Sequence, residues 1–249
     1  MCELMNPEFR FDYFGIKINA TNPVETVSFL LDYDYSNPNY ILFPDSSVVA
    51  AAEQDATLTK ILNGALLTLP DGLPSALYAR SRGFKKVDTV SGYRLCNALL
   101  NSAKTHYFLG GSIDILDKIK QNIRRKFPNA KILGFATLPF YEMEQVRHEL
   151  VLKDEIDKIN LLKPDLIWVG ISSPKQDFLL NNHVKILAHG LLLGVGGVFD
   201  YLAETQKKSP EWVKKIGLRW LWRLAKEPKR LGPKYLAVIR FYLSRGFKH

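Results

Sequence analysis

Short apolar segments that end in glycine, proline or polar residues recur along the first 203 residues of the chain. The clearest are residues 40–43, 107–109, 166–169 and 191–195, and longer helical patterns separate most of them. Short apolar strands that alternate with helices form a parallel sheet covered by helices on both faces. The pattern therefore predicts an α/β protein, and the 249 residues suffice for one large domain or a domain with an appendage.

The other elements follow from the same periodicities. An extended start is expected at residues 9–18, and Asn22 with Pro23 has the composition of a helix start. A single helix is expected over residues 46–62. The remaining predictions are strands at 65–69 and 131–135 and helices at 73–82 and 92–103.

The composition excludes several classes of protein. The apolar fraction of 47% and the charged fraction of 24% are those of a globular protein, not of a disordered or fibrous one. The two cysteines are too few for a disulfide framework or a cysteine-rich zinc site, which favours a reduced, cytoplasmic setting. Neither a signal peptide nor an apolar run long enough to span a membrane is expected.

The positive charge is concentrated at the C-terminus. Residues 204–249 contain 13 Lys and Arg and three Glu, a charge of +10, whereas the whole chain carries +9. Three of the four tryptophans, Trp212, Trp220 and Trp222, also lie there. A neutral body with a basic, aromatic tail points to an anionic partner: a phosphate, a lipid head group or a nucleic acid.

The tail is predicted to form short helices, with breaks at Glu227-Pro228 and at Gly232-Pro233. Apolar and basic residues recur at helical spacing on different arcs, as in a helix that lies on a membrane surface. The alternative is a helical pair whose tryptophans pack against the core.

Ligands of open parallel sheets bind beyond the carboxyl ends of the strands. Asp71 follows the expected strand at 65–69, where it is either a general base or a turn residue that binds its own backbone. Gly110 and Gly111 open a helix, so they either bind a phosphate or form an ordinary tight turn.

Cofactor and metal motifs are weak in this sequence. Residues 194–199 imitate a dinucleotide fingerprint, but Phe199 stands where the third glycine belongs, and no helix is expected to open there. Asp32 and Asp34 are interpreted as a solvated helix end, and the five histidines lack zinc-site spacing. Neither a metal nor a cofactor is therefore predicted.

Five turns occur together in a characteristic order. They are Pro70-Asp71-Gly72, Val90-Ser91-Gly92, Phe108-Leu109-Gly110-Gly111, Pro174-Lys175-Gln176-Asp177 and Gly196-Gly197-Val198-Phe199-Asp200. The tail adds two motifs at residues 217–224 and 227–230. From about residue 12 to about residue 243 the chain resembles the WecG/TagA/CpsF glycosyltransferases.

The resemblance implies an enzyme with a Rossmann-like core that inverts the anomeric configuration of the transferred sugar and needs no metal. Such enzymes transfer N-acetylmannosamine, its uronate or a related hexose from UDP to a polyprenyl-diphosphate-linked acceptor in cell-surface polysaccharide synthesis. The implied catalytic base is Asp71, and Asp45 is the second choice. The nucleotide-sugar site is predicted to comprise Ser91, Gly92, Gly110, Gly111, Lys175, Gln176, Gly196, Gly197 and Asp200.

The resemblance also gives the basic tail a role. Arg219, Arg223 and Arg230 are implied to reach the diphosphate and complete the site at an anionic membrane surface. We therefore divide the chain into a core at residues 1–203 and an appendage at residues 204–249. The expected location is cytoplasmic, on the inner face of the cell membrane, and homo-oligomerisation stays open.

Two departures from the family pattern keep alternatives open. Phe43 stands where the family usually has threonine, and Thr89 stands where it commonly has arginine. An inactive relative that scaffolds polysaccharide synthesis is one alternative reading. The other is a nucleic-acid-binding module, which the neutral core and the tryptophan-rich tail disfavour.

Overall fold

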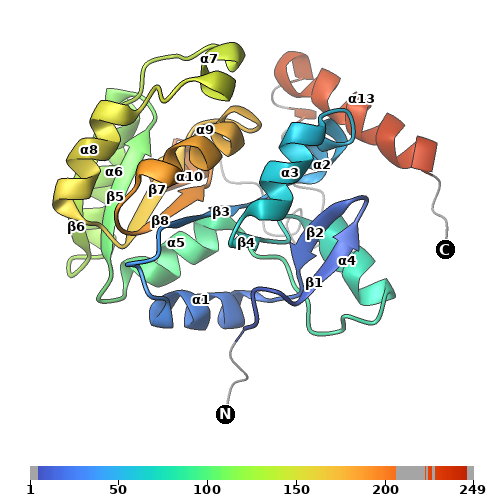
Figure 1. Ribbon diagram of the computed structural model, residues 1–249, viewed down its shortest axis with the longest axis horizontal. Coiled ribbons are helices and arrows are strands. Elements are labelled where there is room, and N and C mark those ends of the chain that lie inside the picture. The colour runs from blue at the N-terminus through green and yellow to red at the C-terminus, as the bar shows by residue number, and fades with distance from the viewer. Residues whose placement is uncertain (1–4, 206–221, 223, 226–227, 246–249) are drawn as a thin grey trace.

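The computed structural model describes residues 5–205, 222, 224–225 and 228–245. Its centre is a six-stranded parallel sheet in the order β4-β3-β8-β7-β5-β6, with helices on both faces (Figure 1). A two-stranded antiparallel hairpin, β1-β2, stands beside this sheet. The predicted α/β class with a Rossmann-like sheet is confirmed.

The strands are short and most of the helices are only a few turns long. In chain order the strands are β1 (Arg10–Tyr13), β2 (Ile16–Asn19), β3 (Asn39–Leu42), β4 (Leu67–Thr68), β5 (Thr105–Gly110), β6 (Lys131–Ala136), β7 (Leu166–Gly170) and β8 (Leu191–Gly194). The helices that precede β6 are α1 (Pro23–Asp32), α2 (Ser46–Ala52), α3 (Ala56–Gly64), α4 (Leu73–Ser81), α5 (Gly92–Leu100) and α6 (Ile113–Lys126). Those that follow β6 are α7 (Met143–His148), α8 (Lys153–Leu162), α9 (Lys175–His183), the 3₁₀ helix η1 (Val184–Ile186), α10 (Val198–Leu202) and α13 (Pro228–Arg245).

Alternation of side chains along the strands divides the core into two apolar clusters. On β5, Tyr107 and Leu109 point to one face of the sheet, whereas Phe108 points to the other. The first face is covered by α2, α3, α8 and α9, and the second by α1, α5, α6 and α10. Burial on both faces explains why the strands read as continuous apolar runs.

Capping side chains set where several helices begin. The side chain of Asn22 accepts hydrogen bonds from the backbone N–H groups of Val24 and Glu25, so the predicted start of α1 is confirmed. The single helix expected over residues 46–62 is wrong, because the side chain of Asp55 accepts from Thr57 N and Leu58 N and starts α3 as a separate helix.

The expected extended start is a hairpin with a two-residue turn at Phe14 and Gly15. The guanidinium of Arg10, on β1, donates to the carbonyl oxygens of Asn63 at 3.1 Å and Ala65 at 2.7 Å. These bonds attach the hairpin to the end of α3 and satisfy carbonyl groups that a helix end leaves without a partner.

Helix α13 continues through Gly232 and Pro233, so the break expected there is wrong. Pro233 lies in the second turn, where it removes only the hydrogen bond that would reach back into the first turn. The rest of the helix is unaffected. The helix packs against α2 and the hairpin (Figure 1).

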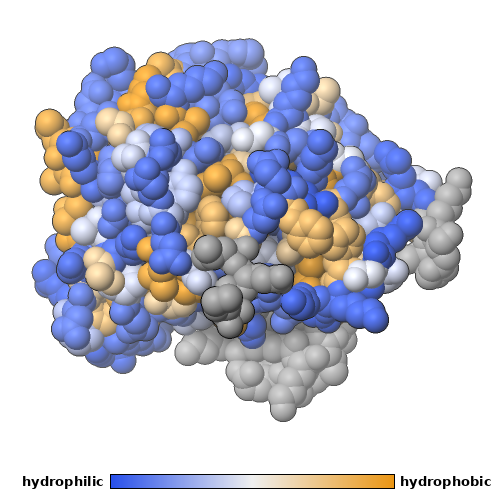
Figure 2. Space-filling model, turned by 60° about the horizontal axis from the view of Figure 1, so that its bottom comes forward, coloured by the Kyte–Doolittle hydropathy of each residue, from blue (hydrophilic) through white to orange (hydrophobic). Residues whose placement is uncertain are grey.

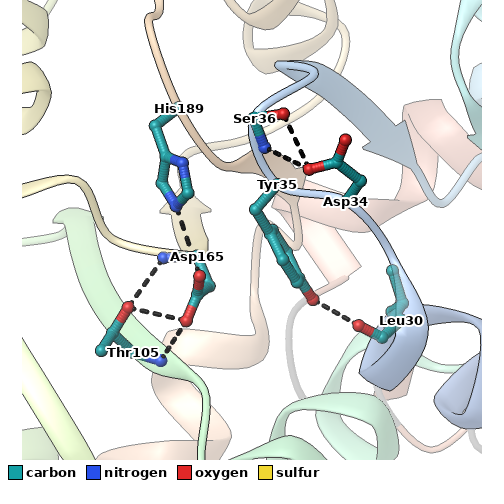
Figure 3. Close-up of polar contacts among 7 residues, drawn as sticks. All are labelled: Leu30, Asp34, Tyr35, Ser36, Thr105, Asp165 and His189. Carbon is teal, nitrogen blue, oxygen red and sulfur yellow. Dashed lines mark hydrogen bonds and ion pairs between the residues drawn. The ribbon is translucent and has the colours of Figure 1, made fainter.

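A polar cluster fixes the amino-terminal edge of the sheet (Figure 3). The Asp165 carboxylate accepts from Thr105 N at 2.8 Å, from Thr105 Oγ1 at 2.9 Å and from the His189 ring at 3.3 Å. Burial alone would raise the pKa of Asp165, but these hydrogen bonds hold it below its ordinary value. The cluster joins the starts of β5, β7 and β8 and lies at the opposite edge from the predicted site.

The face seen in Figure 2 is mostly hydrophilic, with separate hydrophobic patches. In the part of the chain that the structure describes, no helix has both the length and the apolar character needed to cross a membrane.

Candidate functional site at the carboxyl edge of the sheet

The carboxyl ends of all six strands lie at one edge of the sheet, because every pairing in it is parallel. The loops that follow β4, β3, β8, β7 and β5 therefore stand side by side. In that order they carry Asp71, Asp45, Gly196 with Gly197, Lys175 with Gln176, and Gly110 with Gly111. The structure brings these predicted site residues to one edge.

Strands β5 and β7 form a topological switch point. They are neighbours in the sheet, but the chain leaves β5 towards β6 and leaves β7 towards β8 on the other side. Connections that diverge in this way open a crevice at the carboxyl edge, which is where doubly wound sheets bind ligands. Gly110 and Gly111 lie at this point.

Glycine is required in this turn. Gly110 has a φ of 111° and Gly111 a φ of 74°, and residues other than glycine rarely adopt such positive φ values. The Ser112 hydroxyl then caps α6 by accepting from Ile115 N at 3.3 Å. The first turn of α6 therefore begins at the carboxyl edge beside the switch point, and helix N-termini bind anions through their free N–H groups.

Phe199 fills the space above the two strands. A Cβ atom on Gly170 would lie 2.5 Å from the Phe199 ring, and one on Gly111 would lie 3.3 Å from it. The ring is 3% exposed and belongs to α10, so the expectation that no helix opens after Gly197 is wrong. The aromatic side chain occupies the place that a third glycine would leave empty.

Gln176 connects the loops after β7 and β8. Its Nε2 donates to Ser173 Oγ at 2.6 Å and to Gly194 O at 3.0 Å, and its Oε1 accepts from Gly196 N at 3.0 Å. The side chain is 3% exposed. Both ends of the amide are therefore bonded to the loops that surround the predicted site.

Lys175 is held by the connection between β6 and α7. Its Nζ donates to Tyr141 O at 2.6 Å and lies 4.0 Å from the centroid of the Phe140 ring. The ammonium group is half-buried at the carboxyl edge, and a cation held over an aromatic face is stabilised by the ring quadrupole.

The Asp71 loop is joined to the start of α5. Val90 N donates to Pro70 O at 2.9 Å, which places Asp71 beside Ser91, the N-cap residue of α5. The Asp71 side chain is half-buried, and Gly72 follows it with a φ of 101°. This position brings a carboxylate and a helix start together at the carboxyl edge.

Close packing at Gly92 attaches α5 to the loop after β8. A Cβ atom there would lie 3.0 Å from Val195 Cγ1 and 3.1 Å from Val198 Cγ2. Contacts therefore run continuously from the Asp71 loop through Ser91 and Gly92 to the loops of β8, β7 and β5.

Asp45 lies on the neighbouring loop but is used as a helix cap. Its Oδ1 accepts from Ser47 N at 2.9 Å and Val48 N at 3.1 Å, at the start of α2. The carboxylate is exposed. Capping gives Asp45 a structural role, which leaves Asp71 as the first candidate for a base.

Four predicted site residues remain: Asp200, Arg219, Arg223 and Arg230. Asp200 is a half-buried residue of α10. Arg219 and Arg223 lie outside the described residues, as does the side chain of Arg230 on α13.

Sequence reasoning missed Arg94. It is exposed in the first turn of α5, and no ion pair or hydrogen bond joins its guanidinium to the described part of the chain. Side chains of a helix point towards its N-terminus, which for α5 is the carboxyl edge. The sequence signal that could have indicated Arg94 is its position three residues after Ser91, the N-cap of α5.

Phe43 and Thr89, the two departures from the family pattern, differ in their surroundings. Phe43 is 7% exposed and belongs to the second apolar cluster. Thr89 N donates to Asp88 Oδ1 at 2.8 Å, and Arg80 Nη2 binds the same oxygen at 2.9 Å. A guanidinium is therefore present beside Thr89, on α4.

Within the described ranges, no group of three or more His, Cys, Asp or Glu could hold a metal ion. Asp34 accepts from Ser36 and Asn37 at the turn after α1, and the hydrogen bonds from Ser36 lower its pKa. This pattern agrees with a helix-end turn.

The fold and site define an α/β protein with glycine-rich turns and a carboxylate at the carboxyl edge of its sheet. The profile of the glycosyl transferase WecG/TagA/CpsF family matches residues 11–248. The chain therefore belongs to this glycosyltransferase family, as the sequence resemblance predicts.

Several relatives carry the name N-acetylglucosaminyldiphosphoundecaprenol N-acetyl-beta-D-mannosaminyltransferase. The protein of Bacillus spizizenii is 25% identical over 215 residues, which cover 83% of this chain and 80% of the relative. That of Bacillus subtilis strain 168 is 26% identical over 223 residues, with 85% and 83% covered. The protein of Staphylococcus aureus strain MW2 is 23% identical over 249 residues, with 95% and 93% covered.

Proposed function

We propose that the chain is an inverting glycosyltransferase that moves a sugar from UDP to a polyprenyl-diphosphate-linked acceptor. The sugar is N-acetylmannosamine, its uronate or a related hexose. The observation that carries the proposal is the continuous contact at the carboxyl edge between the Asp71 loop, the start of α5 and the glycine turns of β8 and β5. Family membership and the names of the relatives supply the reaction class.

Asp71 is the proposed base. In an inverting transfer the acceptor hydroxyl attacks the anomeric carbon from the face opposite to UDP, and the bond between that carbon and the UDP oxygen breaks. The hydroxyl proton goes to the Asp71 carboxylate as the new bond forms. A positioned base of this kind contributes about 10²–10⁴-fold.

The leaving diphosphate needs positive charge around it. The first turn of α6, after Gly110 and Gly111, can offer backbone N–H groups, and Lys175 and Arg94 are cations in the first turns of α9 and α5. Arg219, Arg223 and Arg230 of the basic tail are proposed to complete this set, because guanidinium binds phosphate in a bidentate manner.

The acceptor determines the proposed location, which is cytoplasmic and peripheral on the inner face of the cell membrane. The tail carries a charge of +10, and each Lys or Arg near an anionic bilayer contributes about 1 kcal/mol to binding. Tryptophans suit the membrane interface.

A transfer assay tests the proposal. The full chain is incubated with UDP-N-acetylmannosamine and a short-chain lipid that carries a diphosphate-linked N-acetylglucosamine, and UDP release and the disaccharide product are measured. UDP-glucose, UDP-N-acetylglucosamine and the uronate donor are run in parallel. We expect transfer that survives EDTA. UDP binding without turnover on every donor would instead favour the inactive scaffold, and a strict metal requirement would refute the metal-independent mechanism.

A further inference from the structure

The turn of the β1-β2 hairpin holds a bulky residue where glycine or asparagine is preferred. Tyr13 pairs with Ile16, so Phe14 and Gly15 form a two-residue loop, and their φ values are 54° and 85°. Two positive φ values define a type I′ turn, whose preferred sequences are Asn-Gly and Gly-Gly. A left-handed conformation is strained for a residue such as phenylalanine.

The Phe14 ring joins the hairpin to α4 and α13. Its centroid lies 5.5 Å from that of Tyr78 on α4, and 5.1 Å and 6.0 Å from those of Phe241 and Tyr242 on α13. Phe241 is 5% exposed. Aromatic pairs at these distances stabilise a contact beyond the area they bury. The residue that strains the turn is thus the one that binds α13.

A chain of hydroxyl groups fixes the same end of α13 to the start of α2. The Tyr242 hydroxyl lies 2.5 Å from the Tyr13 hydroxyl and 2.8 Å from Ser46 Oγ. Burial raises the pKa of Tyr13, so this hydroxyl stays protonated and can donate. Ser46 is the first residue of α2 and directly follows Asp45 at the carboxyl edge.

Among the described residues, α13 packs mainly against α2 and the hairpin. Arg245 Nε donates to Glu53 at 2.7 Å, which adds an exposed ion pair of small value. On the other side, Leu236, Ile239 and Leu243 are 57%, 48% and 76% exposed. In the part of the chain that the structure describes, Phe14, Tyr13 and Ser46 supply the aromatic and hydroxyl contacts to α13.

We propose that Phe14 and Tyr242 are positioning residues that hold α13 in a socket formed by the hairpin and α2. Arg219 and Arg223 precede α13 in the chain and Arg230 lies on it, so the place where α13 is bound limits which part of the core these arginines can reach. The inference rests on the proposed function, in which tail arginines act on the diphosphate. It explains why the hairpin keeps a strained phenylalanine in its turn.

The substitution Phe14→Asn separates docking from core stability. Asparagine suits the type I′ turn, which offsets the loss of the ring contact with Tyr78, so we expect the urea midpoint of the core to change little. Hydrogen–deuterium exchange of the amides at residues 228–245 should accelerate at least about 10-fold. Turnover with the lipid-diphosphate acceptor should fall at least about 10-fold, as a loss in kcat. Phe14→Tyr keeps the ring and should retain both properties, whereas Tyr242→Phe should show a smaller change in the same direction.

Phe9→Asn is the matched control, since the exposed Phe9 ring contacts Phe84 and not α13. The inference is overturned if exchange in α13 is unchanged in Phe14→Asn, or if α13 is released while turnover stays normal. Wild-type chain that fails to transfer any sugar refutes the proposed function, a result that is independent of the exchange difference between variant and wild type.

Discussion

The carbonyl oxygen of Gly170 lies 2.9 Å from the position that a Cβ atom would occupy on Gly110. Strands β5 and β7 therefore approach at the switch point more closely than any side chain at residue 110 allows. The positive φ of Gly110 adds a second requirement for glycine. Backbone geometry and close approach together therefore require glycine at residue 110.

Gly110→Ala is expected to destabilise the fold by about 2–4 kcal/mol, since backbone strain and a clash with the Gly170 carbonyl combine. The matched control is Gly83→Ala, at a φ of 94° with no atom within 4 Å, which should cost only about 1–2 kcal/mol. Urea unfolding measures both. Equal losses in the two variants would show that the close approach to Gly170 contributes nothing.

Asp71→Asn is expected to reduce turnover by about 10²–10⁴-fold while UDP affinity changes little, because the amide keeps the shape of the side chain but cannot accept the proton. Asp45→Asn is the comparison, and we expect a smaller loss, since that side chain caps α2. Steady-state kinetics and UDP titration give the two quantities. Near-normal turnover in Asp71→Asn would move the base to another residue.

Local sequence signals predicted the parts of the fold that depend on local physics. Apolar runs such as residues 166–169 gave the strands, and Asn22 gave the start of α1. The hairpin was missed because Phe14, and not asparagine, precedes Gly15 in its turn. The helix at 46–62 was overextended because its apolar periodicity continues across Asp55, whose capping role is visible only in its hydrogen bonds.

The candidate site was predictable in its residues but not in their partners. Parallel strands place their carboxyl ends together, so loops found one by one in the sequence had to share an edge. The strand order depends on long-range packing, and the sequence did not reveal which loops would touch. Gln176 shows this: its amide binds Gly194 and Gly196, which are about 20 residues away in the chain.

Gln176→Glu tests whether the amide connects the two loops. A carboxylate can accept from Gly196 N but cannot donate to Gly194 O, so the buried charge should raise the folded-state pKa of the new side chain above its unfolded value. The variant should lose about 2–3 kcal/mol of unfolding free energy at pH 7 and recover part of it as the pH falls towards 5, where the protonated acid donates. Gln54→Glu, at an exposed turn, should lack this recovery.

The buried His106 should make the fold less stable in acid. Its Nδ1 accepts from Trp168 Nε1 at 3.1 Å, and burial lowers its pKa from 6.5 to about 4. Between pH 6.5 and 4 the unfolded chain therefore binds a proton that the folded chain does not. As the pH decreases through this window, the free energy of unfolding decreases by up to about 3 kcal/mol.

Urea unfolding at pH 7.5 and pH 4.5 measures this loss. His106→Gln keeps an acceptor for Trp168 and should reduce the pH dependence, although His183, whose pKa burial also lowers, retains part of it. His148→Gln changes an exposed side chain and should behave as the wild type. An unchanged slope in His106→Gln would refute the role given to this residue.

The basic tail gives the last prediction. If the tail arginines complete the site, Arg219→Ala and Arg223→Ala should each reduce turnover about 10-fold or more on a water-soluble acceptor as well as on a lipid one, since a lost guanidinium leaves the diphosphate charge unmatched. Arg240→Ala is the control, because Arg240 is exposed on α13 and has no partner among the described residues.

Binding to anionic vesicles is measured in parallel. Loss of vesicle binding with normal turnover on the soluble acceptor would leave the tail as a membrane anchor alone. Full turnover of both variants on the lipid acceptor would remove these arginines from the site.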